Sequence, residues 1–435
     1  MKLRPPPSLR YVVWYYHLDE LEAWDFLPGR DLVVVARGQG GPADQHPYDF
    51  STGDGDDKEY WTSNSQLQQI SNLGEIQQQY ISSCEGSPYN YNMLTHECHV
   101  DASDPSLPVY TTRYKVKFYP DVKVEEKRSK VKEVEETYNV FVGSEIVKWN
   151  RMDNTIDKLY DMFDYAAPKD DDKSGSYTTF NGLWNTEDAA CSGGESITGI
   201  EWHHISSVTA GTQENILVAS RELNTIWSFA HDGSGKKWQF SSSLDSDYSF
   251  ESDVDMFYQP HSAMQLPNGD IMLIDNGGAR PGCTLEKTGG CFSRAIAYEL
   301  KDSGVARVRW QFEYPYQLNA SSGEYGASHF VARADDDYTP TPNADLATVF
   351  THDLFNWDGG SVARLADGHY LVAFTAVEAT RDWNPSASMY AFEVDGRGKA
   401  LTMLVIPNGD STDGGYRLRA WSAIDGESPT SPFGE

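Results

Sequence analysis

The sequence contains no run of 18 apolar residues, and basic residues are scarce in it. Without such a run there is no candidate for a membrane-spanning helix. Lys and Arg number 35 against 65 Asp and Glu, so the formal net charge is −30. Because neutralising phosphates requires a basic face, we expect neither a nucleic-acid partner nor binding to an anionic membrane surface. The start, MKLRPPPSLRYVVWYY, lacks the apolar core of a signal peptide, and none is predicted there.

The common enzyme signatures are also missing. The sequence has no G-x-S-x-G elbow, no Walker loop, and no G-x-G-x-x-G stretch that opens a helix. His96-Glu97-Cys98-His99 lacks the paired C-x-x-C spacing of a zinc site, and the three aspartates at 170–172 lack the alternating ligands of a calcium loop. We therefore predict no metal site and no cofactor.

Cysteine is rare, but the spacing of the five cysteines is informative. Cys283 and Cys291 bracket a short Gly-rich loop, Cys84 and Cys98 bracket a similar loop, and Cys191 is left over. Two local disulfides and one thiol are typical of an oxidising compartment. The sequence thus predicts the pairs Cys283–Cys291 and Cys84–Cys98 and an extracytoplasmic location, in a secreted protein or an organelle lumen.

Turn residues and aromatics are abundant. With 36 Gly, 21 Pro, 12 Trp, 25 Tyr and 18 Phe, short apolar runs alternate with N-G, D-G and G-G turns, which favours an all-β protein with a sizeable core. One turn-and-strand pattern recurs and predicts the inner hairpin of a repeated β unit. Irregularly spaced units of this kind favour a β-propeller over a sandwich. The pattern occurs at 27–35, 211–220 (GTQENILVAS), 266–275 (LPNGDIMLID) and 365–374 (LADGHYLVAF).

We expect one domain over residues 1–435 with two decorations. At 112–142, alternating apolar residues flank the charged stretch EEKRSK, which predicts a two-stranded β-ribbon with a solvated face. At 166–200, a polar, Gly- and Ser-rich composition predicts a long surface loop.

Four residues stand beside strand-like runs in separate units: His96, His204, Arg221 and His261. Taken singly, a histidine beside a strand is usually a surface or hydrogen-bonded residue. Taken in order, the stretches WHHISSV, ILVASRELNTIW, QPHSAMQLPNGDIMLIDNGG, SRAIAYEL, GGSVARLADGHYLVAF and GGYRLRAW resemble the arylsulfotransferase family over about residues 90–425. The resemblance is greatest to the branch typical of fungi and algae.

The resemblance implies a six-bladed β-propeller with its site at one mouth of the central channel. It implies transfer of a sulfuryl group from a phenolic sulfate ester to a phenol acceptor, without a nucleotide donor, by a ping-pong reaction through sulfohistidine. His261 matches the family's nucleophile. A neutral imidazole suits that role, because it is nucleophilic near neutral pH and passes the group on. His204 and Arg221 are expected to bind the sulfate oxygens, and His96 to serve the phenolic oxygen as donor or base.

The chain departs from the family pattern at two places. The family's Q-H-D is here Pro260-His261-Ser262, and the asparagine of H-I-N-S is Ser206. These departures leave open a second hypothesis, a non-catalytic propeller that keeps the scaffold and binds a glycan or protein partner. A third, another enzyme activity on the same propeller, also stays open because fold alone does not fix chemistry.

Overall fold

The computed structural model describes residues 21–27, 31–37, 65–71, 75–82, 94–120, 122, 124–125, 137–138, 140–168, 183–186, 197–212, 214–281, 292–313, 355–356, 359–365, 367–375, 377–378 and 389–406. This part of the chain is built of β-strands with two one-turn 3-10 helices, η1 (Met162–Asp164) and η2 (Asp253–Asp255). The all-β prediction is confirmed. No described helix is long and apolar enough to cross a membrane.

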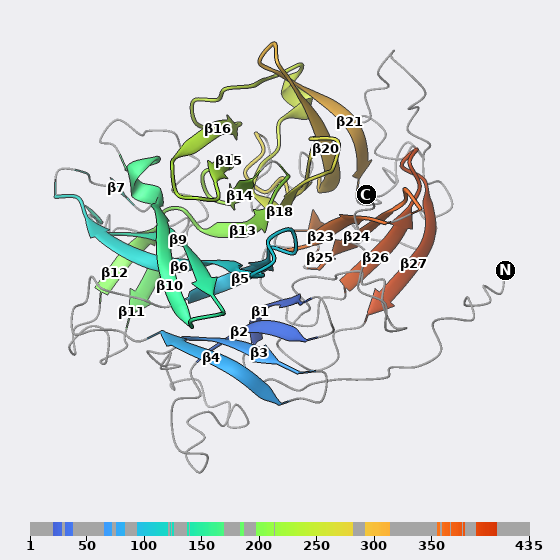
Figure 1. The fold of residues 1–435 in the computed structure, drawn as a ribbon. Coiled ribbons are helices and arrows are strands. Elements are labelled where there is room, and N and C mark those ends of the chain that lie inside the picture. The colour runs from blue at the N-terminus through green and yellow to red at the C-terminus, as the bar shows by residue number, and fades with distance from the viewer. Residues whose placement is uncertain are drawn as a thin grey trace, which may run out of the picture.

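Five sheets follow one another around a common centre as the blades of a propeller (Figure 1). Strands β1 (Leu21–Phe26), β5 (Leu94–Val100), β13 (Ile205–Ala210), β18 (Pro260–Gln265) and β23 (Ser361–Arg364), one from each blade, contact one another in this order, so these strands lie innermost. Five blades are found in the described residues, and the sixth expected blade is not confirmed. Blade 1 contains β1 (Leu21–Phe26), β2 (Leu32–Arg37), β3 (Ser65–Ile70) and β4 (Ile76–Ser82); blade 2 contains β5 (Leu94–Val100), β6 (Val109–Phe118), β9 (Val140–Asn150) and β10 (Thr155–Asp161), extended by β11 (Leu183–Thr186) and β12 (Ile197–Glu201).

The remaining blades repeat the antiparallel order of four strands. A short fifth strand, β17, adds to the outer edge of blade 4 in parallel with β21. Two small hairpins, β7–β8 and β22–β25, lie outside the blades. Blade 3 contains β13 (Ile205–Ala210), β14 (Asn215–Ser220), β15 (Thr225–Ala230) and β16 (Lys236–Ser241); blade 4 contains β17 (Ser249–Phe250), β18 (Pro260–Gln265), β19 (Ile271–Asp275), β20 (Arg294–Lys301) and β21 (Val305–Glu313); blade 5 contains β23 (Ser361–Arg364), β24 (Tyr370–Phe374), β26 (Met389–Val394) and β27 (Ala400–Ile406); the hairpins are β7 (Val124–Glu125) with β8 (Thr137–Tyr138), and β22 (Phe355–Asn356) with β25 (Val377–Glu378).

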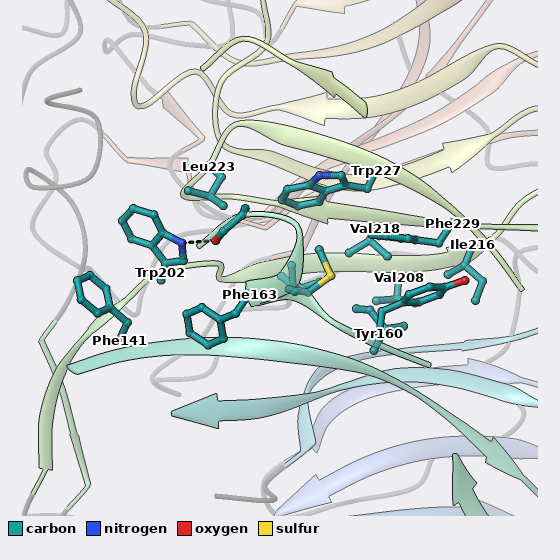
Figure 2. Close-up of a cluster of buried hydrophobic side chains, with 14 of the residues drawn as sticks. Phe141, Tyr160, Phe163, Trp202, Val208, Ile216, Val218, Leu223, Trp227 and Phe229 are labelled. Carbon is teal, nitrogen blue, oxygen red and sulfur yellow. Dashed lines mark hydrogen bonds between the residues drawn. The ribbon is translucent and has the colours of Figure 1, made fainter. Parts of the chain in front are cut away.

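The hydrophobic core lies between consecutive blades. Every residue of β14 and β15 is buried, because their blade is covered on both faces. Figure 2 shows the cluster between blades 2 and 3, where the rings of Tyr160 and Phe229 stack with centroids 4.4 Å apart. Burying one large apolar side chain contributes roughly 1.5–3 kcal/mol, so these layers hold adjacent blades together. Similar clusters lie between blades 1 and 2, 3 and 4, and 4 and 5.

The repeated sequence pattern corresponds to one repeated turn, as predicted. In blade 4 the amide of Leu266 donates to the carbonyl of Asp270 over 2.8 Å, and Gly269 takes the positive φ of 93° that the turn requires. The same five-residue closure joins the first two strands of blades 1, 3 and 5 at the other three occurrences. These inner hairpins mark one end of the propeller, and each inner strand therefore begins at the opposite end.

The two predicted decorations are organised differently from the prediction. Residues 112–118 and 140–142 belong to β6 and β9, which pair with each other as full strands of blade 2. Only the short β7–β8 hairpin lies outside the blade in this segment. Within 166–200 the structure contains β11 and most of β12, which pair with each other, and β12 also joins β9 in parallel. Both segments thus contribute strands to blade 2.

One predicted disulfide partner is placed by the structure. Cys98 lies in β5 and is fully buried in the core between blades 1 and 2. Cys84, Cys191, Cys283 and Cys291 lie outside the described residues, so both pairings stay predictions.

Candidate functional site

The predicted site residues belong to one end of the propeller by topology. His204 directly precedes β13, His261 is the second residue of β18, and His96 is the third residue of β5. Arg221 opens the turn from β14 to β15, which lies at the end where β13 begins. The side chain of His96 lies outside the described residues.

Side-chain bonds show that the inner strands of blades 3 and 4 run in the same direction. Ser206, near the start of β13, donates its hydroxyl to the carbonyl of Pro260, the first residue of β18. Thr209, further along β13, donates to the carbonyl of Ala263 over 2.8 Å. An early residue of β13 thus bonds an early residue of β18, and a later residue bonds a later one. His204 and His261 therefore lie at the same end of neighbouring blades.

Each inner strand that carries a predicted histidine is irregular at this end. The register of pairing shifts within or beside the position of the histidine, as in a β-bulge. Bulges bend a strand and re-aim its side chains, and they are frequent next to active sites. The shifts lie between Leu94 and Cys98 in β5, between Ile205 and Ser207 in β13, and between His261 and Met264 in β18.

The ring of His261 is fully buried and held on one side. Its Nδ1 lies 2.6 Å from Oδ1 of Asn276 and 3.3 Å from the carbonyl oxygen of Gln259. Gln259 and Ser262, which flank the Pro-His pair, both have a φ of 53°. A non-glycine residue is uncommon in this region and persists only where its surroundings hold it. The backbone on both sides of His261 is therefore constrained.

His204 and Arg221 form one charged cluster with two glutamates. Nδ1 of His204 lies 3.0 Å from a carboxylate oxygen of Glu201, and the carbonyl of His204 accepts the amide of Arg221 over 2.9 Å. The Arg221 guanidinium donates to the carboxylate of Glu222. Burial raises the pKa of Glu222, while the charges of Arg221 and His204 act to lower it. Arg221 and His204 thus each have a carboxylate beside them.

Asn224 joins this cluster to the strand of His261. It closes the same β14–β15 turn as Arg221 at a φ of 47°, and its Oδ1 accepts the amide of Gln259 over 2.7 Å. Together with the bond from Ser206 to Pro260, this contact fixes the start of β18 against blade 3. The structure therefore connects His261 to the His204–Arg221 cluster across the boundary between two blades.

The neighbouring His203 has a structural role. Its ring is fully buried, Nδ1 accepts the amide of Ser144 over 3.2 Å, and Nε2 lies 3.0 Å from the carbonyl oxygen of Ala166. Burial lowers the pKa of His203 to about 4, so the ring is neutral at pH 7. Gly143 lies against it, and a side-chain carbon at that position would collide with the His203 ring and with Phe163.

A buried ionic cluster supports the outer side of blade 4 at this end. The carboxylate of Asp275 accepts Nη2 of Arg280 over 2.6 Å and Nε of Arg294 over 2.8 Å, and its other oxygen accepts the amide of Tyr258. Burial raises the pKa of Glu313, the cross-strand neighbour of Arg294, to about 8. The cluster holds the last residue of β19 next to the first residue of β20. Asn276 directly follows β19.

Sequence reasoning missed Asn276. Asn276 follows Asp275 in the stretch DNGG, and the family resemblance implies no role for its amide. A polar residue at the end of a buried strand was the available signal. Ser206, which stands where the family has asparagine, donates its hydroxyl to the carbonyl of Pro260.

Two further features lie apart from these residues. A cavity of about 420 Å³ lies between blades 2 and 3, beside Tyr165, Trp202 and Leu223, and neither His204, Arg221 nor His261 lines it. In the described part of the chain, Asp367, His369 and Glu393 come close enough to share a metal ion. They lie at the hairpin turn of blade 5, the end of the propeller opposite His261, and we assign no ion to them.

Comparison with solved structures finds distant similarity. A protein of unknown function from Bacteroides caccae is 11% identical, with 90% of this chain and 85% of that chain covered and a TM-score of 0.40. Hydrazine synthase from Kuenenia stuttgartiensis is 8% identical, with coverage of 92% and 70% and a TM-score of 0.36. Virginiamycin B lyase from Staphylococcus aureus is 9% identical, with coverage of 90% and 86% and a TM-score of 0.31. Such scores assign neither fold nor function.

Family membership comes from the sequence. No curated protein matches the chain. The model of the family described as Arylsulfotransferase (ASST) matches residues 45–325, which is more than half of the chain. His96, His204, Arg221, His261 and Asn276 all lie inside the matched segment. The chain therefore belongs to the arylsulfotransferase family.

Proposed function

We propose that the protein is a nucleotide-independent aryl sulfotransferase that works by a ping-pong mechanism through a sulfohistidine at His261. One observation carries the proposal. His261 stands at the bulged start of an inner strand, and side-chain bonds tie that start to the blade that presents His204 and Arg221. A histidine beside a cationic pair is what sulfuryl transfer from an anionic ester requires.

In the first half-reaction, an imidazole nitrogen of His261 forms a bond to sulfur while the bond from sulfur to the phenolic oxygen breaks. The electron pair leaves on that oxygen, which takes a proton from His96. In the second half-reaction, the hydroxyl of the acceptor phenol gives its proton to His96 and attacks sulfur, and the N–S bond breaks. Charge on the three equatorial sulfate oxygens is stabilised by Arg221 and His204.

The protein's strongly acidic composition makes such a local cationic pair necessary. With a net charge of −30, an anionic donor is repelled at long range, and binding depends on fixed cations at the site. Glu201 and Glu222 balance His204 and Arg221 in the absence of substrate. We infer that the donor's sulfate shares these cations with the two carboxylates.

The carboxylates also favour the second candidate function, a non-catalytic propeller that binds a glycan or protein partner. If Glu201 and Glu222 keep both cations engaged, no sulfate ester binds. Incubation with a chromogenic phenyl sulfate and a phenol acceptor, without nucleotide, separates the two functions. Phenol release that depends on the acceptor supports the transferase. If the folded protein releases no phenol from any aryl sulfate in a panel, the result supports the binding propeller.

We also retain as proposals a sixth blade, the two disulfides and an extracytoplasmic location. The disulfide proposal rests on the spacing of Cys283 with Cys291 and of Cys84 with Cys98. Mass spectrometry of an unreduced digest of protein from an oxidising source tests it. Peptides linked through these pairs support the location, and free thiols at all four positions contradict it.

A further inference from the structure

Asn276 makes three side-chain contacts in the described structure. It directly follows β19 and is fully buried. Its Nδ2 donates to the carbonyl oxygens of Asn356 and Gly359, over 3.0 and 3.1 Å. Its Oδ1 lies 2.6 Å from Nδ1 of His261. The amide thus spans from the inner strand of blade 4 to the segment that leads into blade 5.

These contacts determine where the proton on His261 sits. Carbonyl oxygens only accept hydrogen bonds, so the amide nitrogen of Asn276 has to face Asn356 and Gly359. Its Oδ1 must then face the imidazole, and this oxygen too only accepts. Nδ1 of His261 therefore carries a hydrogen. The second group near Nδ1, the carbonyl of Gln259 at 3.3 Å, is an acceptor as well and requires the same assignment.

We propose that Asn276 is a positioning residue that fixes the ring of His261 and keeps Nδ1 protonated, so that Nε2 is the nitrogen that takes the sulfuryl group. This inference rests on the proposed function. In the neutral ring with a hydrogen on Nδ1, the lone pair is on Nε2, and only that nitrogen can form the N–S bond. An uncharged amide orients the ring without the negative charge that would favour the imidazolium form, which has no lone pair to attack with.

The segments that lead into β20 and β23 hold Asn276 and its partners in place. The hydroxyl of Ser293 donates to the carbonyl of Asn276 over 2.8 Å and accepts the amide of Asn356 over 3.1 Å. Gly360 has a φ of 94°, and a side-chain carbon there would lie 2.9 Å from the carbonyl of Ala373. The stretches DNGG, SRA and GGS, which are far apart in the sequence, therefore meet around one asparagine. Together they hold the carbonyls of Asn356 and Gly359, which orient the side-chain amide of Asn276.

Nitrogen-15 NMR of the wild-type protein with labelled histidine tests the proton position without any catalysis. The resonances of His261 are assigned by their loss in His261→Gln. We expect the neutral ring to show a hydrogen on Nδ1. A hydrogen on Nε2 in the neutral ring would overturn the inference, whatever the protein's activity.

The isomer of the sulfated histidine is the second test and separates the two proposals. Wild-type protein is quenched after reaction with a labelled phenyl sulfate without acceptor, and the attachment nitrogen is read from the digest. Label on Nε2 of His261 supports the inference. Label on Nδ1 overturns it and leaves the sulfotransferase intact. If His261 carries no label, the proposed function fails, and the NMR result still decides the role of Asn276.

Substitution of Asn276 gives a third readout. Asn276→Leu removes the acceptor that faces Nδ1 of His261. The matched control is Asn268→Ala, in the exposed turn of the same hairpin. We expect Asn276→Leu to lower kcat roughly 10–100-fold with little change in KM, as loss of a ring-orienting partner commonly does. Equal kcat in Asn276→Leu, Asn268→Ala and wild type would overturn the inference.

Discussion

Ser206 in blade 3 donates its hydroxyl to the carbonyl of Pro260, the residue before His261 in blade 4. The departure from the family's asparagine thus places a short hydroxyl where it holds the neighbouring strand. Asn224 makes a parallel contact to the amide of Gln259, one residue further back. The start of β18 is consequently fixed from blade 3 at two successive positions.

Replacing Ser206 should therefore affect both stability and turnover. Ser206→Ala leaves the buried carbonyl of Pro260 without this donor, which typically costs about 1–3 kcal/mol. We expect a lower urea midpoint and a reduced kcat, because the ring of His261 moves with its strand. Ser234→Ala, at an exposed turn of the same blade, is the control. Unchanged midpoint and kcat in Ser206→Ala would show that the contact contributes nothing.

The free energy of unfolding should fall below about pH 6.5 because of His203. Its folded pKa is about 4 against an ordinary value of 6.5, so between these values the unfolded chain binds more protons than the folded one. The contribution of His203 to the free energy of unfolding is fully present above pH 6.5. Between pH 6.5 and pH 4 it declines by up to about 1.4 kcal/mol for each pH unit of acidification. Urea unfolding at pH 7.5, 6 and 5 measures it. His203→Gln should show a shallower decline, and an identical slope would contradict the assignment.

Gly143→Ala should destabilise the interface between blades 2 and 3. The added methyl group collides with the rings of His203 and Phe163, and overpacking of this kind typically costs roughly 1–3 kcal/mol. Gly396→Ala is the matched control, since nothing lies within 4 Å of the added carbon there and its φ is ordinary. Thermal melts should separate the two variants. Equal melting temperatures would mean that the core accommodates the methyl group.

Arg221→Ala should lower kcat/KM for the donor on the order of a hundredfold, the usual cost of losing one donor to a developing oxyanion. A trace of activity should remain, because His204 and the nucleophile are still present. Arg309→Ala, an exposed arginine in β21, should behave as wild type. Steady-state kinetics with a phenyl sulfate measure the effect. Wild-type kcat/KM in Arg221→Ala would remove this residue from the site.

The parts of the fold that local chemistry decides were predictable from the sequence. The hydrogen-bonded turn from Leu266 to Asp270 requires only a glycine at positive φ between two apolar strands. The sequence shows that pattern directly. The strand pair within 112–142 was visible too. Its place in blade 2 depends on pairing with β5 and β10, which lie outside this segment, and a local pattern does not reveal that pairing.

The candidate site was predictable as residue types and less so as contacts. A nucleophilic histidine and an arginine follow from motif order. Three features arise only when the blades pack. They are the register shifts beside His204 and His261, the bond from Ser206 to Pro260 and the orientation of Asn276. Asn276 has no titratable group and so gives little signal in the sequence, although its Oδ1 lies 2.6 Å from Nδ1 of His261.

The central claim is that His261 carries the sulfuryl group. Rapid quench of wild type and His261→Ala with a phenyl sulfate labelled in the sulfuryl group, without acceptor, tests it most directly. We predict label on the wild-type protein that is stable in base and lost in acid, no label on His261→Ala, and no turnover by that variant or by His261→Asn. Label on both proteins, or turnover by wild type without any trapped label, would contradict the claim.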